Sequence, residues 1–137
     1  MATVTLRFHP SAEHVRTARL VAVAVARRAG FDEARLDEVR LAVGEICARA
    51  VRRCEAAGVA EAVVVSLDDA EGDLVVDVVD EASSDPSDGV IEEPVALALV
   101  RGLADDVGLH EGPGGEGGRV RLLWARGRPP RFGFDSP

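Results

Sequence analysis

The chain has 137 residues, a formal charge of −8 at pH 7 and 47% apolar residues, few of them aromatic. This length suits one domain with its own hydrophobic core, and the apolar content excludes a disordered chain. All 16 basic residues are arginines, which excludes chemistry that needs a lysine, such as a P-loop or a Schiff base. The negative charge argues against direct nucleic-acid binding and favours a partner with a basic protein surface.

The first part of the chain predicts a strand followed by a helix. Residues 2–8 alternate between apolar and polar types, as in a strand with one buried face. Ser11 is a suitable N-cap for a helix over residues 12–29, which Gly30 would end. Residues 20–25 of this helix are apolar on almost every side, which indicates burial on two faces or contact with another subunit.

A second helix is predicted over residues 32–54, with an aspartate as its N-cap. Glu45 and Arg49 lie four residues apart on a face flanked by small apolar residues, and this spacing predicts an ion pair between them. A carboxylate in these surroundings is a candidate catalytic or binding group, although the pattern also fits an ordinary solvated helix face. Cys47 and Cys54 are too far apart along this helix for a disulfide, and no nearby residues complete a metal site.

The second half of the chain predicts a hairpin and then a helix with two short strands. Valine-rich strands are expected over residues 61–67 and 73–80, joined by a polar turn. Asp80 shares a face with the apolar residues of its strand, so its carboxylate is expected to point inward, towards a partner or as a cap of the following turn. The remaining elements are expected at 95–106 (a helix opened by Pro94), 107–110 and 120–124 (strands joined by a flexible glycine-rich turn).

This order of elements describes an α+β fold, a two-layer sandwich in which a mixed β-sheet is covered by helices on one face. Residues 1–125 are expected to form a single domain and residues 126–137 a flexible C-terminal tail, because the tail has no periodicity. No apolar run reaches the length of a membrane span, and no charged-then-apolar leader opens the chain. A cytoplasmic protein without a membrane partner is therefore expected.

Three segments carry a resemblance to a known family: VRLAVGEICARAV in the second helix, VVDE at a strand end and LALVRGLADDV in the third helix. Together with the order of elements they resemble the GHKL (HATPase) superfamily and its Bergerat-like ATPase fold, over residues 4–124. The most similar branch is that of the small anti-sigma-factor serine kinases. The resemblance implies an enzyme that uses ATP and magnesium to phosphorylate an antagonist protein, that binds a sigma factor and that leans towards a homodimer.

The resemblance also implies roles for single residues. Glu45 would be the general base, and Asp80 would receive the adenine amino group. Arg49 stands where the family has the asparagine that holds magnesium. A guanidinium has only donors and a permanent positive charge, so it cannot coordinate a cation. No metal is therefore expected in this chain.

The positions that would hold the nucleotide have changed in several places. The degenerate nucleotide-binding positions are Arg49, Asp80, Ala82, Ser84, Pro94, Ala96 and Gly117. Pro94 lacks the N–H group that a phosphate would use at a helix N-terminus, and Glu92 and Glu93 add negative charge there. Gly117 is followed by a second glycine where the family has a threonine, so that hydroxyl is absent.

Three interpretations follow. The first is an anti-sigma-factor-like regulatory binding protein of a partner-switching system, with weakened or lost ATP binding and no cofactor held with family-like affinity. Its partners would be a sigma factor, an anti-sigma antagonist protein or both. The alternative is an active, ATP-dependent serine protein kinase, favoured by the retention of Glu45 and Asp80. The third is a dimerising scaffold without either activity.

Overall fold

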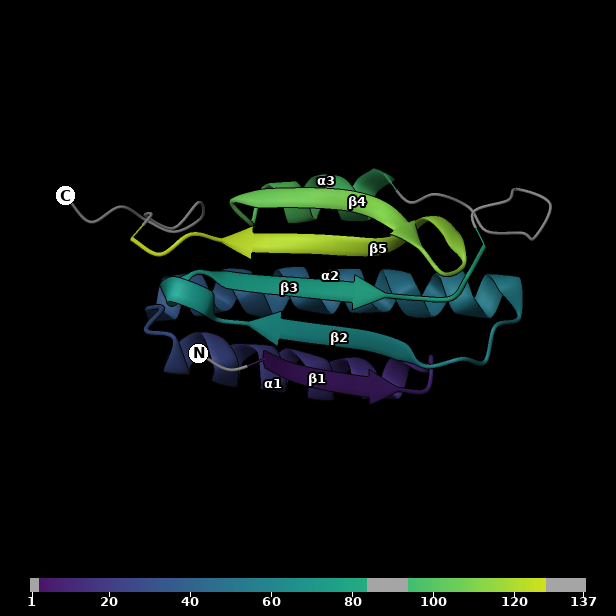
Figure 1. Cartoon of the computed structure of the whole chain (residues 1–137), viewed down its shortest axis with the longest axis horizontal. Coiled ribbons are helices and arrows are strands. Elements are labelled where there is room, and N and C mark those ends of the chain that lie inside the picture. Colours follow the sequence, from purple (N-terminus) through teal and green to yellow (C-terminus); the bar gives the residue numbers. More distant parts are fainter. Residues whose placement is uncertain (1–2, 84–93, 128–137) are drawn as a thin grey trace.

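The computed structural model describes residues 3–83 and 94–127, which form two layers (Figure 1). Within these ranges, one layer is a five-stranded sheet in the order β1-β2-β3-β5-β4, and the α-helices cover one of its faces. The strands are β1 (Thr3–Phe8), β2 (Val63–Asp68), β3 (Leu74–Val79), β4 (Asp106–Gly112) and β5 (Gly115–Trp124). The helices are α1 (Val15–Arg28), α2 (Glu33–Ala57) and α3 (Pro94–Arg101), with 3-10 turns at Ala12–His14 and Ala70–Gly72.

The predicted α+β, two-layer fold is confirmed, but neighbouring strands pair differently from the expected mixed sheet. All the pairings between described strands are antiparallel. Two α-helices connect β1 to β2, so the chain runs through β2 in the direction opposite to β1. Among the described residues, the helix α3 lies between β3 and β4 in the sequence, but β5 lies between these two strands in the sheet and pairs with both. The insertion of β5 therefore leaves no parallel neighbours.

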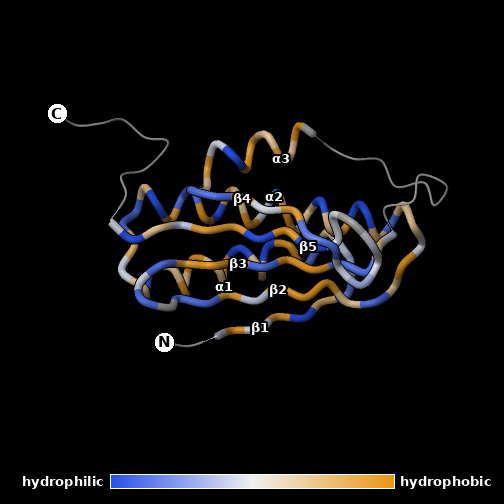
Figure 2. Tube along the Cα trace, turned by 45° about the horizontal axis from the view of Figure 1, so that its top comes forward, coloured by the Kyte–Doolittle hydropathy of each residue, from blue (hydrophilic) through white to orange (hydrophobic). Residues whose placement is uncertain are grey.

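The sheet has a buried face and a half-buried face. β2 and β3 alternate strictly between buried and half-buried residues. Figure 2 shows that both strands are apolar over most of their length, so burial alternates along them although hydropathy does not. The buried face packs against α1 and α2, and the residues between the layers form one continuous core.

The central element is α2, which packs against both other α-helices and against β2 and β3. The Asp32 carboxylate caps its start by accepting a hydrogen bond from the Arg35 backbone N–H at 3.0 Å. Gly58 ends it in the left-handed region, at φ 69°, where glycine is favoured. Because neighbours cover this helix on several sides, it buries charged as well as apolar side chains, and these require internal partners.

The third helix ends earlier than predicted, at Arg101 instead of residue 106. Leu103 leaves the helical path, and its carbonyl accepts a hydrogen bond from the buried Trp124 indole at 3.0 Å. The backbone N–H of Asp105 donates to the Leu123 carbonyl at 2.8 Å, which joins the segment to the sheet. Tertiary hydrogen bonds thus replace the last helical turn that local periodicity predicts.

The glycine-rich segment is more ordered than the expected flexible turn. Gly112 pairs with Gly115, so most of this segment belongs to β4 and β5, and the connection between them is a tight hairpin. A Cβ atom on Gly114, in the hairpin, would collide with the backbone of Glu81. The glycines therefore allow a close approach between this hairpin and the end of β3.

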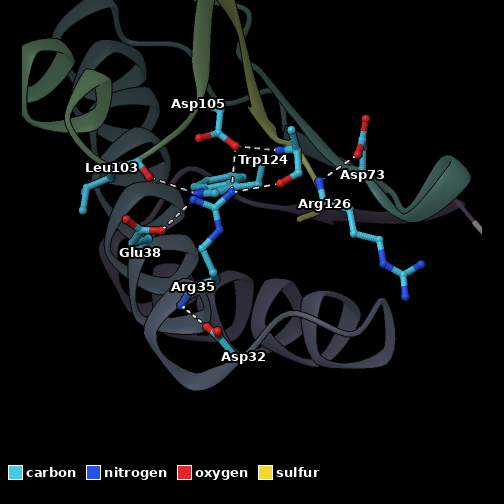
Figure 3. A network of polar contacts seen from close by, with 9 residues as sticks. Asp32, Arg35, Glu38, Asp73, Leu103, Asp105, Trp124 and Arg126 are labelled. Atoms are coloured by element: carbon cyan, nitrogen blue, oxygen red, sulfur yellow. Dashed lines mark hydrogen bonds and ion pairs between the residues drawn. The ribbon is translucent and has the colours of Figure 1, made fainter. Parts of the chain in front are cut away.

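A buried ionic network fastens the first turn of α2 to the far end of the sheet (Figure 3). Arg35 donates to Glu38 at 3.1 Å, to Asp105 at 2.7 Å and to the Ala125 carbonyl at 3.2 Å. Asp105 also accepts from the Ala125 backbone N–H at 2.6 Å. These contacts join the segment after α3 and the end of β5 to α2, so the LADDV part of the third motif has a structural role here.

Most of the expected C-terminal tail, residues 128–137, lies outside the described residues. None of the helices in the described ranges is long and apolar enough to cross a membrane.

Candidate functional site

The residues singled out by the sequence meet where the C-terminal half of α2 faces the end of β3 and the start of β5. Glu45, Arg49 and Arg53 follow one another at intervals of four on α2, so they lie along one ridge of the helix. Arg49 is 1% exposed and Arg53 is 3% exposed, whereas Glu45 is half-buried. Two guanidinium groups are thus held inside the molecule beneath the sheet.

Arg53 forms a buried ion pair with Asp80, directly after β3. The Arg53 Nε donates to Asp80 Oδ2 at 3.1 Å, and its Nη2 donates to the Ala82 carbonyl at 3.0 Å. The other Asp80 oxygen accepts from the Ala82 backbone N–H at 2.9 Å. The inward direction predicted for Asp80 is confirmed, since the residue is 2% exposed. Its carboxylate both caps the following turn and neutralises Arg53.

The electrostatics of this pair have two opposing causes. Burial raises the pKa of the Asp80 carboxyl above its ordinary value, although Arg53 and the hydrogen bond from Ala82 offset part of this effect. Removing Arg53 would take away the largest of the contributions that offset this burial. The carboxylate therefore depends on this guanidinium for its charge.

Arg49 reaches across to β5, where its Nη1 donates to the Gly117 carbonyl at 3.2 Å. The expected pair between Glu45 and Arg49 is not formed. Within the described part of the chain, the Glu45 carboxylate makes no hydrogen bond or ion pair. Helical spacing alone predicts the pair, but the sheet above α2 buries Arg49 and supplies a fixed carbonyl acceptor on the far side.

The remaining predicted positions lie on neighbouring elements. Ala82 is fully buried after β3, Ala96 is buried on α3, and Gly117 is buried in β5 with φ at 81°. Pro94 is the first residue of α3, as the proline preference predicts. Ser84 lies outside the described residues, as do Glu92 and Glu93.

Arg53 is the residue that sequence reasoning missed. The signal was present, because Arg53 continues the four-residue spacing from Glu45 and Arg49. It was hidden by the adjacent Arg52, which is exposed, so the sequence alone shows two arginines at the end of an ordinary polar helix face. Only the position of β3 distinguishes them.

The described residues offer neither a reactive cysteine thiol nor a cluster of metal-binding side chains. Burial raises the pKa of Cys47 to about 12, and burial together with Asp80 raises the pKa of Cys54 to about 11. Both thiols are therefore protonated near pH 7 and unreactive. Residues 3–83 and 94–127 contain no group of three or more His, Cys, Asp and Glu side chains that could hold a metal ion.

Comparison with known proteins identifies the family. The family described as "Histidine kinase-like ATPase domain" matches residues 8–124, most of the chain. The chain belongs to this family. A solved structure similar to this ATPase-like domain is the crystal structure of the RsbU and RsbW domains of Rv1364c from Mycobacterium tuberculosis, with a TM-score of 0.72 and 21% sequence identity. The match covers 98% of this chain and 35% of that one. No curated protein matches the chain.

Two features of Arg49 and Asp80 bear on the roles that the resemblance implies for them in a histidine kinase-like ATPase domain. The resemblance places an adenine acceptor at Asp80, yet both of its oxygens accept hydrogen bonds from the protein. It places a magnesium ligand at Arg49, which offers only donors.

Proposed function

We propose that this domain is a regulatory binding protein of the anti-sigma, partner-switching type that acts without ATP. The family supports the anti-sigma type, and the fold shared with the structure containing an RsbW domain agrees with it. The main observation in favour of lost ATP binding is the buried ion pair between Arg53 and Asp80. Its partners would be a sigma factor, an anti-sigma antagonist protein or both, in the cytoplasm and with a homodimer as the proposed assembly.

The adenine end of the site supports this proposal. A nucleotide that used Asp80 would have to displace the Arg53 guanidinium, which is 3% exposed. Removing one partner of a buried ion pair costs about 3–5 kcal/mol. Since about 1.4 kcal/mol corresponds to a tenfold change in a binding constant, the pair would weaken nucleotide binding by about two to three and a half orders of magnitude.

The phosphate end supports it independently. Without an oxygen ligand at Arg49 there is no site for the magnesium that offsets the triphosphate charge. Arg49 also donates to the carbonyl of Gly117, one of the positions that the resemblance assigns to nucleotide binding. Pro94 begins α3 without an N–H donor. Weak, metal-independent binding of adenosine or ADP is the most that this arrangement favours.

An active serine protein kinase is the second candidate, and one observation favours it. The Glu45 carboxylate is half-buried and makes no contact that would occupy it among the described residues. It is therefore available as a general base. This candidate requires that Arg49 and Arg53 move away when a nucleotide binds, with the costs given above.

Calorimetry with ATP, with and without magnesium, tests the proposal. The wild-type protein is expected to show no magnesium-dependent binding at micromolar concentrations. A variant that carries Arg49→Asn, Pro94→Gly and Ala96→Gly is expected to gain affinity, because it supplies an oxygen ligand at position 49 and opens the anion site while it keeps the stabilising Arg53.

Arg40→Ala is the matched control, because it removes an exposed arginine of the same helix and should leave nucleotide binding unchanged. Low-micromolar, magnesium-dependent binding by the wild type would contradict the proposal and favour the kinase. Phosphorylation of an antagonist protein by the wild type would have the same consequence.

A further inference from the structure

The helix α3 exposes two large apolar side chains next to each other. Val95 is 80% exposed and Leu99 is 44% exposed, and the two lie one turn apart on the same side of the helix. Among the described residues, Leu20 and Leu41 are also exposed, but they stand on separate helices. Scattered apolar residues are ordinary on a protein surface, whereas neighbouring ones indicate a contact surface.

The rest of α3 gives the helix little polar surface. Its sequence, PVALALVR, contains a single charged residue. Ala96, Leu97 and Val100 are buried. Figure 2 shows α3 at the edge of the molecule, with apolar residues over most of its length. The helix is therefore buried on one side and apolar on the other, as expected of a helix that packs on two sides.

The apolar patch is too small to hold a free partner. A stable protein–protein interface buries about 1,200–2,000 Å² in total, which takes about 20–30 residues on each side. Here the exposed apolar contact rests mainly on Val95 and Leu99. A segment of the same chain needs far less area, because its tether gives it an effective concentration of roughly millimolar. A second copy is also disfavoured by charge, since each copy carries −8.

The chain leaves the sheet beside the end of α3. The Trp124 indole donates to the Leu103 carbonyl at 3.0 Å, two residues beyond the helix. The Asp105 carboxylate accepts from the Ala125 backbone N–H at 2.6 Å. An extended chain from residue 127 to residue 134 spans about 23–25 Å, and a helix as long as α3 spans about 12 Å. The residues that follow β5 can therefore reach the whole length of α3.

Residues 128–137, RPPRFGFDSP, carry apolar side chains at a spacing that suits this helix. Phe132 and Phe134 occupy alternate positions, so an extended segment points both rings to one side, about 6.5–7 Å apart. Val95 and Leu99 are separated by a helical rise of about 6 Å. Each ring can therefore meet one of the two exposed side chains.

The charge and the stiffness of this segment also favour docking. Residues 128–137 contain two arginines and one aspartate, a formal charge of +1, so the rest of the chain carries −9 of the total of −8. The segment is thus complementary in charge to the domain. Two prolines precede the phenylalanines, and proline favours an extended backbone. Less conformational entropy is then lost when the segment docks.

We infer that residues 128–137 fold back along α3, antiparallel to the helix. Phe132 then packs against Leu99, and Phe134 packs against Val95. The segment covers apolar surface that α3 otherwise leaves in water. The open face of the sheet is the other surface within reach, but the β3 residues there are already half-buried and gain less from a cover. This inference goes beyond the proposed function and depends neither on a partner nor on the nucleotide site.

Disulfide trapping in the full chain tests the inference. Val95→Cys and Phe134→Cys are introduced together, and the other contact is kept. The native thiols do not interfere, because burial raises the pKa of Cys47 to about 12 and is the main cause that raises the pKa of Cys54 to about 11. Under mild oxidation of dilute protein, the engineered pair is expected to close within one chain about tenfold or more faster than control pairs.

Two control pairs combine the same Phe134→Cys with a cysteine elsewhere. Leu41→Cys lies on α2, where the native side chain is 56% exposed, and Val75→Cys lies on the open face of the sheet. Equal rates in the three pairs would mean that the segment does not dock, and faster closure with Val75→Cys would place it on the sheet. Disulfide-linked dimers in place of closed chains would make a second copy the occupant. Each of these results would overturn the inference.

Hydrogen exchange gives a second readout without engineered thiols. Deletion of residues 128–137 is expected to speed amide exchange in α3 about tenfold or more and to change it in α1 less than about twofold. Phe132→Ser with Phe134→Ser should reproduce the deletion. Arg128→Ala with Asp135→Ala keeps both rings and the charge of the segment, and should retain most of the protection. Exchange in α3 that the deletion leaves unchanged, or that rises equally in all helices, would contradict docking. ATP calorimetry reports on the nucleotide site alone, so either proposal can fail without the other.

Discussion

Replacing Arg53 with alanine is expected to destabilise the protein strongly, although this arginine lies next to the exposed Arg52 in the sequence. Arg53 is 3% exposed and donates to Asp80 at 3.1 Å and to the Ala82 carbonyl at 3.0 Å. Its removal takes away the main counter-charge of Asp80, which is 2% exposed, and leaves only the smaller contribution of Arg49. Removing one partner of a buried pair costs about 3–5 kcal/mol, a large part of the about 5–15 kcal/mol that stabilises a typical domain.

Urea unfolding at pH 7, followed by circular dichroism, measures this loss as a change in the free energy of unfolding. Arg40→Ala is the matched control. Arg40 pairs with Asp37 at 2.6 Å, but the two side chains are 45% and 63% exposed. A surface pair of this kind contributes about 0.2–1 kcal/mol, so the two variants should differ severalfold despite similar ion-pair distances.

The pH dependence of Arg53→Ala provides an internal check. Burial already raises the pKa of Asp80, and loss of the guanidinium raises it further. An acid with a raised pKa in the folded state binds more protons than in the unfolded state, so its penalty grows as pH rises above about 4. The loss of stability should therefore be largest at neutral pH and shrink as pH falls towards 4. If Arg53→Ala cost no more than Arg40→Ala at pH 7, the buried pair would not have the energetic role described here.

Two further expectations concern the sheet and its glycines. Burial alone would raise the pKa of Asp77, but hydrogen bonds from two arginines of β5 outweigh it and lower the pKa. Asp77→Asn should therefore lower the melting temperature at pH 7 and progressively less as pH falls below about 4, and a constant difference across this range would contradict it. Gly114→Ala should cost about 1–3 kcal/mol in urea unfolding, because the new Cβ collides with the Glu81 backbone. Gly44→Ala should be nearly neutral, since its Cβ would meet only the Arg19 side chain at 2.7 Å, which can move, and equal losses in the two glycine variants would refute this account.

Local patterns in the sequence predicted the elements and the layers of this protein well. The valine-rich runs with a polar turn between them and the N-cap at Asp32 specify local structure, so β2, β3 and the start of α2 lie within a few residues of their predicted bounds. The end of α3 was predicted wrongly, because LADDV continues a helical pattern that hydrogen bonds to Trp124 and Leu123 interrupt. The antiparallel pairing of every neighbouring strand also depends on a long-range event, the insertion of β5 between β3 and β4.

The candidate site was likewise predicted only in part from the sequence. The inward direction of Asp80 follows from period-two alternation, which is a property of the strand alone. The strand does not predict the partner of that carboxylate, Arg53, because Arg53 belongs to a helix far away in sequence. Spacing on that helix favours a Glu45–Arg49 pair instead. Packing of the sheet over α2 buries Arg49 and Arg53 and turns them towards Gly117 and Asp80. A buried guanidinium must satisfy its donors with whatever acceptors the surrounding elements supply, and only the tertiary structure determines which acceptors these are.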